Sequence, residues 1–171
     1  NVSDQIKFAL VCIAAHFESD FFFNEHSDLI LSSLEFIKNE NHVSKLLLNS
    51  FMKFLFDKQI YLTYSEPILS LLCFLLENLT LVNFEKFFIV SNSFISSHFD
   101  SSYSILIDKI LAVYFEMDEN SQLSNLLFQM ILSLTGSLPF EKQMNYIDIV
   151  FTTKKWTLPM KKTFTTVLPS L

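Results

Sequence analysis

The feature that most constrains the fold of this chain is a nearly continuous apolar stretch, Ser65–Leu79, with the sequence SEPILSLLCFLLENL. At 3.6 residues per turn its polar residues share one narrow stripe, formed by Glu66, Ser70, Cys73 and Glu77. The remaining helix surface carries eight large apolar side chains, whose burial would contribute roughly 12–24 kcal/mol as an upper bound. The stretch therefore predicts a helix that other helices cover on several sides.

The rest of the chain fits an all-α protein. It has 171 residues with 20 Phe, one Gly and four Pro, and the sequence shows no sustained apolar–polar alternation, so a turn-rich β fold is disfavoured. The first helix places Ile6, Leu10, Ile13 and Phe17 on one face. Including the central stretch, the apolar periodicity and capping residues predict nine helices: 4–17, 28–38, 43–56, 65–79, 84–99, 103–117, 122–135, 139–151 and 159–168.

Single residues mark both ends of the predicted helix 122–135. Ser121 is a good N-cap for the helix that follows it. Gly136, the only glycine, stands where that helix ends, and we expect it to adopt a left-handed C-cap.

The spacing of the predicted helices indicates a repeat. Alternate helices begin near residues 28, 66, 103 and 139, so two helices recur about every 37 residues. Hairpins of this kind are apolar on two sides and need neighbours, which favours stacked antiparallel helical hairpins, an α-solenoid. The alternative is an irregular helical bundle. We expect a single domain over residues 1–171, and the first residue, Asn1, indicates a piece of a longer chain.

On this period and pattern, residues 28–168 resemble the HEAT/armadillo-type class of helical-repeat proteins. A tetratricopeptide array is less similar, because its small-residue positions need more than four Ala and one Gly. The peptide-gripping asparagine ladder of armadillo proteins does not carry over, since Asn49, Asn92 and Asn125 fall at different offsets in their helices.

The distribution of charged residues along the chain limits the classes of partner that the protein can bind. Residues 1–141 hold 7 Lys, no Arg and 17 acidic residues, whereas residues 142–171 hold 5 Lys and one Asp. An acidic body without Arg disfavours specific binding of nucleic acid. The longest uncharged run, 120–140, is too rich in polar residues for a membrane span. We expect an intracellular protein, cytoplasmic or nuclear, because Cys12 and Cys73 make no disulfide framework.

Residues for catalysis, metal binding or a cofactor are not recognisable in the sequence. None of the four His residues belongs to a recognisable metal-binding motif, and both Cys lie in apolar helical patterns that disfavour a reactive thiolate. One Gly cannot make a phosphate-binding loop. We therefore expect a protein that is not an enzyme and has no cofactor.

Two segments are candidate partner-binding surfaces. Phe21, Phe22 and Phe23 either close the end of the helical stack or anchor a partner. The second segment is basic and aromatic, and either forms a solvated loop or contacts an acidic protein segment or a nucleic-acid backbone. It comprises Lys154, Lys155, Trp156, Lys161 and Lys162.

The sequence thus predicts a scaffold module that binds other proteins, as a homo-oligomer or hetero-oligomer. Two alternatives remain open. One is a nucleic-acid-associated module that uses the basic C-terminal segment. The other is a carrier of a hydrophobic ligand or lipid inside the Phe-rich core.

Overall fold

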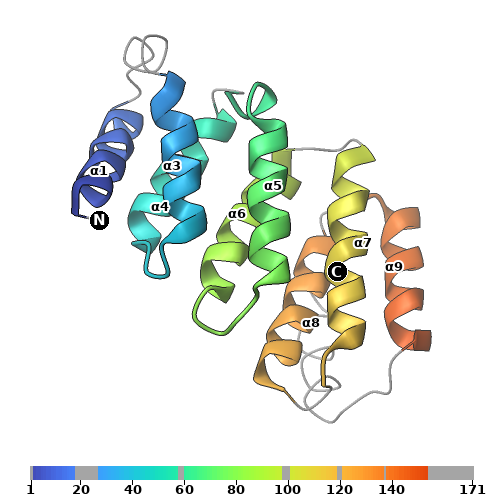
Figure 1. Cartoon of the computed structure of the whole chain (residues 1–171). Coiled ribbons are helices and arrows are strands. Elements are labelled where there is room, and N and C mark those ends of the chain that lie inside the picture. The colour runs from blue at the N-terminus through green and yellow to red at the C-terminus, as the bar shows by residue number, and fades with distance from the viewer. Residues whose placement is uncertain are drawn as a thin grey trace. The chain divides into compact units, whose positions relative to one another are not determined.

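The computed structural model describes residues 2–17, 27–57, 60–97, 101–118, 121–136 and 138–153, and in these residues the protein is all-helical (Figure 1). The all-α prediction is confirmed. The described elements are α1 (Val2–His16), α3 (Ser27–Asn39), α4 (Lys45–Asp57), the short 3₁₀ helix η1 (Ile60–Leu62), α5 (Ser65–Glu77), α6 (Phe84–Ser97), α7 (Ser101–Glu116), α8 (Gln122–Thr135) and α9 (Phe140–Thr153).

These eight α-helices correspond to the first eight of the nine predicted helices. The predicted helix 159–168 lies outside the described residues. Helices α3, α5, α7 and α9 begin at residues 27, 65, 101 and 140, so their starts differ by 38, 36 and 39 residues. The regular spacing read from the sequence is therefore present in the structure.

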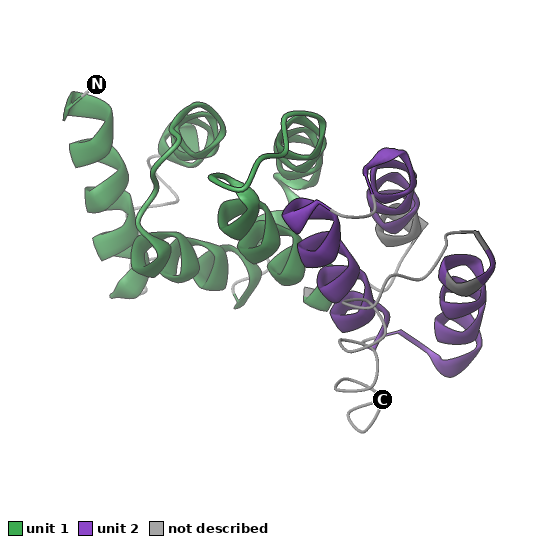
Figure 2. Cartoon of the chain, turned by 90° about the horizontal axis from the view of Figure 1, so that it is seen from below, with its two compact units in different colours: residues 1–97 green, residues 98–171 purple. Residues whose placement is uncertain are grey.

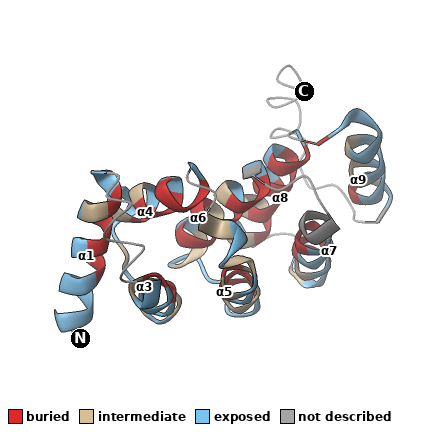
Figure 3. Cartoon of the chain, turned by 90° about the horizontal axis from the view of Figure 1, so that it is seen from above, coloured by how far each residue is buried: buried red, intermediate tan, exposed pale blue. Residues whose placement is uncertain are grey.

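The chain divides into two compact units, residues 1–97 and residues 98–171, which are described separately (Figure 2). Unit 1 has two rows of helices (Figure 3). In one row α1 packs on α4 and α4 packs on α6, while in the other row α3 packs on α5. Contacts of α1 with α3 and of α5 with α6 join the rows. The described helices of unit 1 are therefore packed in two rows that contact each other. That the two units form one domain stays a prediction.

Helix α4 lies at the middle of its row and is buried along its length. Leu48, Phe51, Met52 and Leu55 are each at most 1% exposed. The ring of Phe51 meets the ring of Phe8 from α1 edge-on, with centroids 5.8 Å apart. Aromatic pairs in this geometry add to the stabilisation from buried area, so α4 holds α1 in the row.

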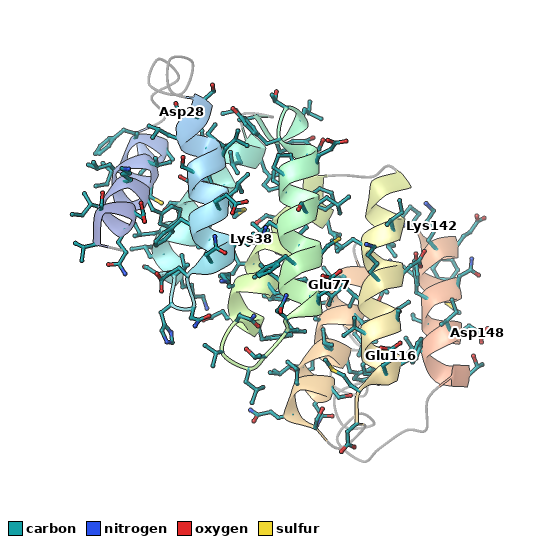
Figure 4. The ribbon with its side chains drawn as sticks, viewed as in Figure 1. Asp28, Lys38, Glu77, Glu116, Lys142 and Asp148 are labelled. Atoms are coloured by element: carbon teal, nitrogen blue, oxygen red, sulfur yellow. The ribbon has the colours of Figure 1, made fainter. Side chains whose placement is uncertain are left out.

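Helix α5 has the surface that its sequence predicts. Its buried residues are Ile68, Leu71, Leu72, Leu75 and Leu76. Glu66, Ser70 and Glu77 are exposed and Cys73 is half-buried, so the polar stripe faces outward. Next to this stripe, the ammonium of Lys38 from α3 lies 4.9 Å from the ring centroid of Phe74. Figure 4 labels Lys38 on α3 and Glu77 on α5.

In unit 2, α8 packs against both α7 and α9. The rings of Tyr114 on α7 and Phe128 on α8 stack with centroids 6.1 Å apart, and both side chains are buried. The hydroxyl of Tyr146 on α9 donates a hydrogen bond of 3.2 Å to Asp108 Oδ1 on α7. Helix α8 is thus the buried centre of the part of unit 2 that the structure describes.

The two ends of α8 give different outcomes for the predicted caps. The hydroxyl of Ser121 accepts a 3.0 Å hydrogen bond from the amide of Ser124, which confirms the N-cap. The left-handed conformation expected for Gly136 is wrong, because its φ of −59° and ψ of −22° are right-handed. Gly136 continues the last turn of the helix, since its amide donates to the carbonyl of Leu132 at 3.1 Å.

The environment of α5 predicts a contrast between two substitutions. Leu72 is 0% exposed, so Leu72→Ala should lower the free energy of unfolding by about 2–5 kcal/mol through lost burial and a residual cavity. Ser70→Ala, on the exposed stripe, should change it by less than about 0.5 kcal/mol. Urea denaturation followed by circular dichroism measures both. Similar stabilities for the two variants would contradict the central position of α5.

Candidate interaction surface on helix α1

The two partner-binding segments that the sequence predicts lie outside the residues that the structure describes. Phe21, Phe22 and Phe23 lie outside the described residues. So do Lys154, Lys155, Trp156, Lys161 and Lys162. Both remain sequence-based predictions, and the described residues offer a different surface.

That surface is on α1, which is apolar on two opposite sides. Phe8, Val11, Cys12 and Ala15 are buried against the neighbouring helices α3 and α4. The ring of Phe8 also stacks on Phe36 of α3, with centroids 5.0 Å apart. One apolar side of α1 therefore satisfies its packing within unit 1.

The opposite side of α1 carries a second apolar row that is open to solvent. Its five large side chains are between 51% and 76% exposed. At 100° per residue they all fall within an arc of about 80°, directly opposite the buried face. We call this row the α1 stripe: Val2, Ile6, Leu10, Ile13 and Phe17.

The sequence pattern identifies four of these five residues as one apolar face but does not show that this face is exposed. The reason is that Phe8, Val11 and Ala15 also have helical spacing, so α1 has two candidate core faces. The choice between them depends on Phe36 and Phe51, which come from other helices. Periodicity within α1 alone carries no signal of that choice.

A groove of about 660 Å³ lies between α1 and α3. Its walls include the apolar side chains of Phe8, Val11 and Phe36. Its charged lining residues are Asp4, Lys7, Glu35 and Glu40. On the helical wheel Asp4, Phe8 and Val11 fall on the side of α1 opposite the α1 stripe, so the groove is a second surface with an apolar wall and a mainly acidic border.

A buried lysine donates hydrogen bonds at the C-terminal end of α3. Lys86 on α6 is only 7% exposed, and its Nζ donates hydrogen bonds of 2.7 Å to the carbonyls of Ile37 and Glu40. These are carbonyls of the last helical turn and the residue after it, which have no partner within an α-helix. Desolvation lowers the pKa of Lys86 below its ordinary value of 10.5, and the nearby Glu40 carboxylate partly opposes this shift.

A smaller pocket of about 360 Å³ lies beside Lys86. Residues 41–45 and the start of α6 contribute to its lining, and across it the ammonium of Lys45 donates a 2.6 Å hydrogen bond to Glu85 Oε1. Both partners of this ion pair are largely exposed, so it adds little stability. The pocket is bounded by structural contacts, and we assign it no ligand.

The chemistry of the remaining candidate residues is limited. Cys12 is buried, and desolvation raises the pKa of its thiol to about 12, so it stays protonated and unreactive at neutral pH. Within the described ranges, no three His, Cys, Asp or Glu side chains are grouped so that they could hold a metal ion. The described helices also include none with the length and apolar character needed to cross a membrane.

Comparisons with protein-family models, with curated proteins and with solved structures find no match for this chain. Its class therefore rests on its own structure, which is that of an all-α protein of packed helices whose described residues include an apolar row open to solvent.

Lys86 gives a prediction for the stability of unit 1. Lys86→Met keeps most of the unbranched side chain but leaves the carbonyls of Ile37 and Glu40 without their ammonium donor. The free energy of unfolding at pH 7 should fall by about 1–3 kcal/mol, as measured by urea denaturation. Lys53→Met, at an exposed position on α4, is the matched control and should be nearly silent.

The lowered pKa of Lys86 also predicts the sign of a pH effect. Between its folded pKa and 10.5, the unfolded state binds more protons at this residue than the folded state, so stability rises with pH. The unfolding free energy of the wild type relative to Lys86→Met should therefore increase as the pH approaches 10.5. A difference that shrinks over this range would contradict a buried, desolvated ammonium.

Proposed function

We propose that the protein is a non-enzymatic interaction module of the helical-repeat class, similar in organisation to HEAT/armadillo-type scaffolds, and that it binds other polypeptides. The single observation that carries this proposal is the α1 stripe. A contiguous apolar row of five large, solvent-exposed side chains is typical of a protein-binding surface rather than of scattered surface residues.

The energy available from the stripe is sufficient for binding but not for very tight binding. Full burial of a large apolar side chain contributes about 1.5–3 kcal/mol, so five side chains that are roughly half exposed offer about 4–8 kcal/mol. Association itself costs at least about 4 kcal/mol in lost translational and rotational freedom. The stripe thus supports weak or moderate affinity, and the charge of Lys7, which flanks the stripe on the helical wheel, would add specificity.

The packing of unit 1 supports the helical-repeat assignment. In a stack of hairpins, each helix of a row contacts one neighbour on one side and the next neighbour on the other. Helix α4 has such neighbours in α1 and α6. Helix α1 contacts α4 and α3 with one face only and presents the stripe on the opposite face. The stripe therefore lies where a further helix would extend the row.

The α1–α3 groove favours a polypeptide over a lipid. An apolar lining bordered by Asp4, Glu35 and Glu40 suits a partner that carries both apolar and polar groups. The lipid-carrier alternative needs an apolar enclosure, which this charged border does not provide. The nucleic-acid alternative rests on lysines outside the described residues and stays a sequence-based prediction.

Site-specific photo-crosslinking tests the proposal. With benzoylphenylalanine in place of Leu10, irradiation should give discrete polypeptide adducts, because this side chain lies in the middle of the α1 stripe. The same group in place of Lys53 on α4 should give few. The double substitution Ile6→Ser/Ile13→Ser should remove the adducts formed at Leu10. Equal adduct patterns from the two positions would exclude the stripe as the binding surface.

A further inference from the structure

We propose that the α1 stripe binds the α1 stripe of a second copy of this chain, with the two helices antiparallel. This inference rests on the proposed function, because it names the occupant of the same surface. The spacing of the stripe residues, the charges around them and their exposed area support this pairing.

The spacing of the residues in the α1 stripe favours a helix as the element that binds there. Ile6, Leu10, Ile13 and Phe17 are separated by four, three and four residues, an average of about 3.7, which is close to the 3.6 residues of one helical turn. The row therefore runs nearly parallel to the axis of α1, and a second helix aligned with α1 can contact it along its length. An extended peptide, whose side chains alternate every two residues, would not match it.

The antiparallel orientation pairs the side chains of the stripe with one another. With the twofold axis between residues 11 and 12, Leu10 faces Ile13 of the second copy and Ile6 faces Phe17 of the second copy. Four apolar layers result from the two symmetric pairs. Antiparallel helices also bring the N-terminus of each macrodipole near the C-terminus of the other, which is favourable.

The charges around the stripe permit this pairing although each chain carries a net charge of −6. On the helical wheel, Asp4 lies outside the stripe, on the side of the groove shared with α3. Lys7 flanks the stripe, and in the antiparallel register it lies beside Ala14 of the second copy rather than beside another Lys7. The small side chains of Ala9 and Ala14 flank the seam and allow the two helices to approach closely.

The area predicts a weak dimer. The four paired side chains, Ile6, Leu10, Ile13 and Phe17, are 51–76% exposed and present roughly 500 Å² per copy, or about 1,000 Å² for the pair. Stable interfaces begin near about 1,200 Å² in total. We therefore infer association in the micromolar range, in which the monomer and the dimer coexist.

Sedimentation velocity on the 171-residue chain, from about 1 to 200 μM, tests the association. The wild type should shift from monomer to dimer, and Leu10→Ser/Ile13→Ser should remain monomeric up to the highest concentration. Leu46→Ser is the control, because Leu46 is an exposed apolar residue of unit 1 outside the stripe, and this variant should dimerise like the wild type. Circular dichroism should show unchanged helix content in both variants, since they replace exposed residues.

Disulfide trapping tests the register. Cys73→Ser removes the half-buried thiol, whereas Cys12 stays, because it is buried and protonated. In this background, a Leu10→Cys chain mixed with an Ile13→Cys chain should form mainly the mixed disulfide dimer under mild oxidation. Preferential Leu10→Cys self-crosslinking would indicate parallel helices and overturn the antiparallel register.

The outcomes separate this inference from the proposed function. A wild-type chain that is monomeric at every concentration overturns self-association, and photo-crosslinks from Leu10 to other polypeptides would still support an interaction module. A dimer that Leu10→Ser/Ile13→Ser does not weaken overturns the inference, because another surface would then hold the copies together.

Discussion

The structure of unit 1 depends on the burial of helices that are apolar on more than one side. Helix α4 shows this most clearly, because its side chains are buried against α1 in one direction and α6 in the other. A helix of this kind cannot reach a stable state alone, since one neighbour covers only one of its faces. The two rows follow from this requirement. In α1, the second apolar face is open to solvent among the described residues of unit 1.

The residues of α1 and α5 show how far sequence reasoning extends. In α5 the polar residues form one stripe, so the outward face is determined within the helix, and the structure places Ser70 and Glu77 there. In α1 two apolar rows lie on opposite faces, and packing on α3 and α4, including Phe36 and Phe51, decides which one is buried. Local periodicity predicts the helices and their spacing. It does not predict a choice made by residues more than 25 positions away.

The end of α8 and the environment of Lys86 illustrate two further limits. Glycine at a helix end favours a left-handed cap but does not require it, and Gly136 instead keeps helical angles and a helical hydrogen bond. A lysine within an apolar pattern gives no sign that its ammonium will be buried. Lys86 becomes buried because two carbonyls at the end of α3 replace the water that it loses. Both outcomes depend on tertiary contacts that a single sequence does not encode locally.

The hydrogen bonds of Lys86 also bear on how unit 1 assembles. Ile37 and Lys86 are 49 residues apart, so the end of α3 obtains these donors only after α6 has docked on the stack. In a linear helical array, stability is approximately the sum of a term for each repeat and a term for each interface between neighbouring repeats. The buried hydrogen bonds from Lys86 on α6 to the end of α3 strengthen such an interface, so opening either helix loses them. Unit 1 should consequently open as one cooperative block rather than unravel one hairpin at a time.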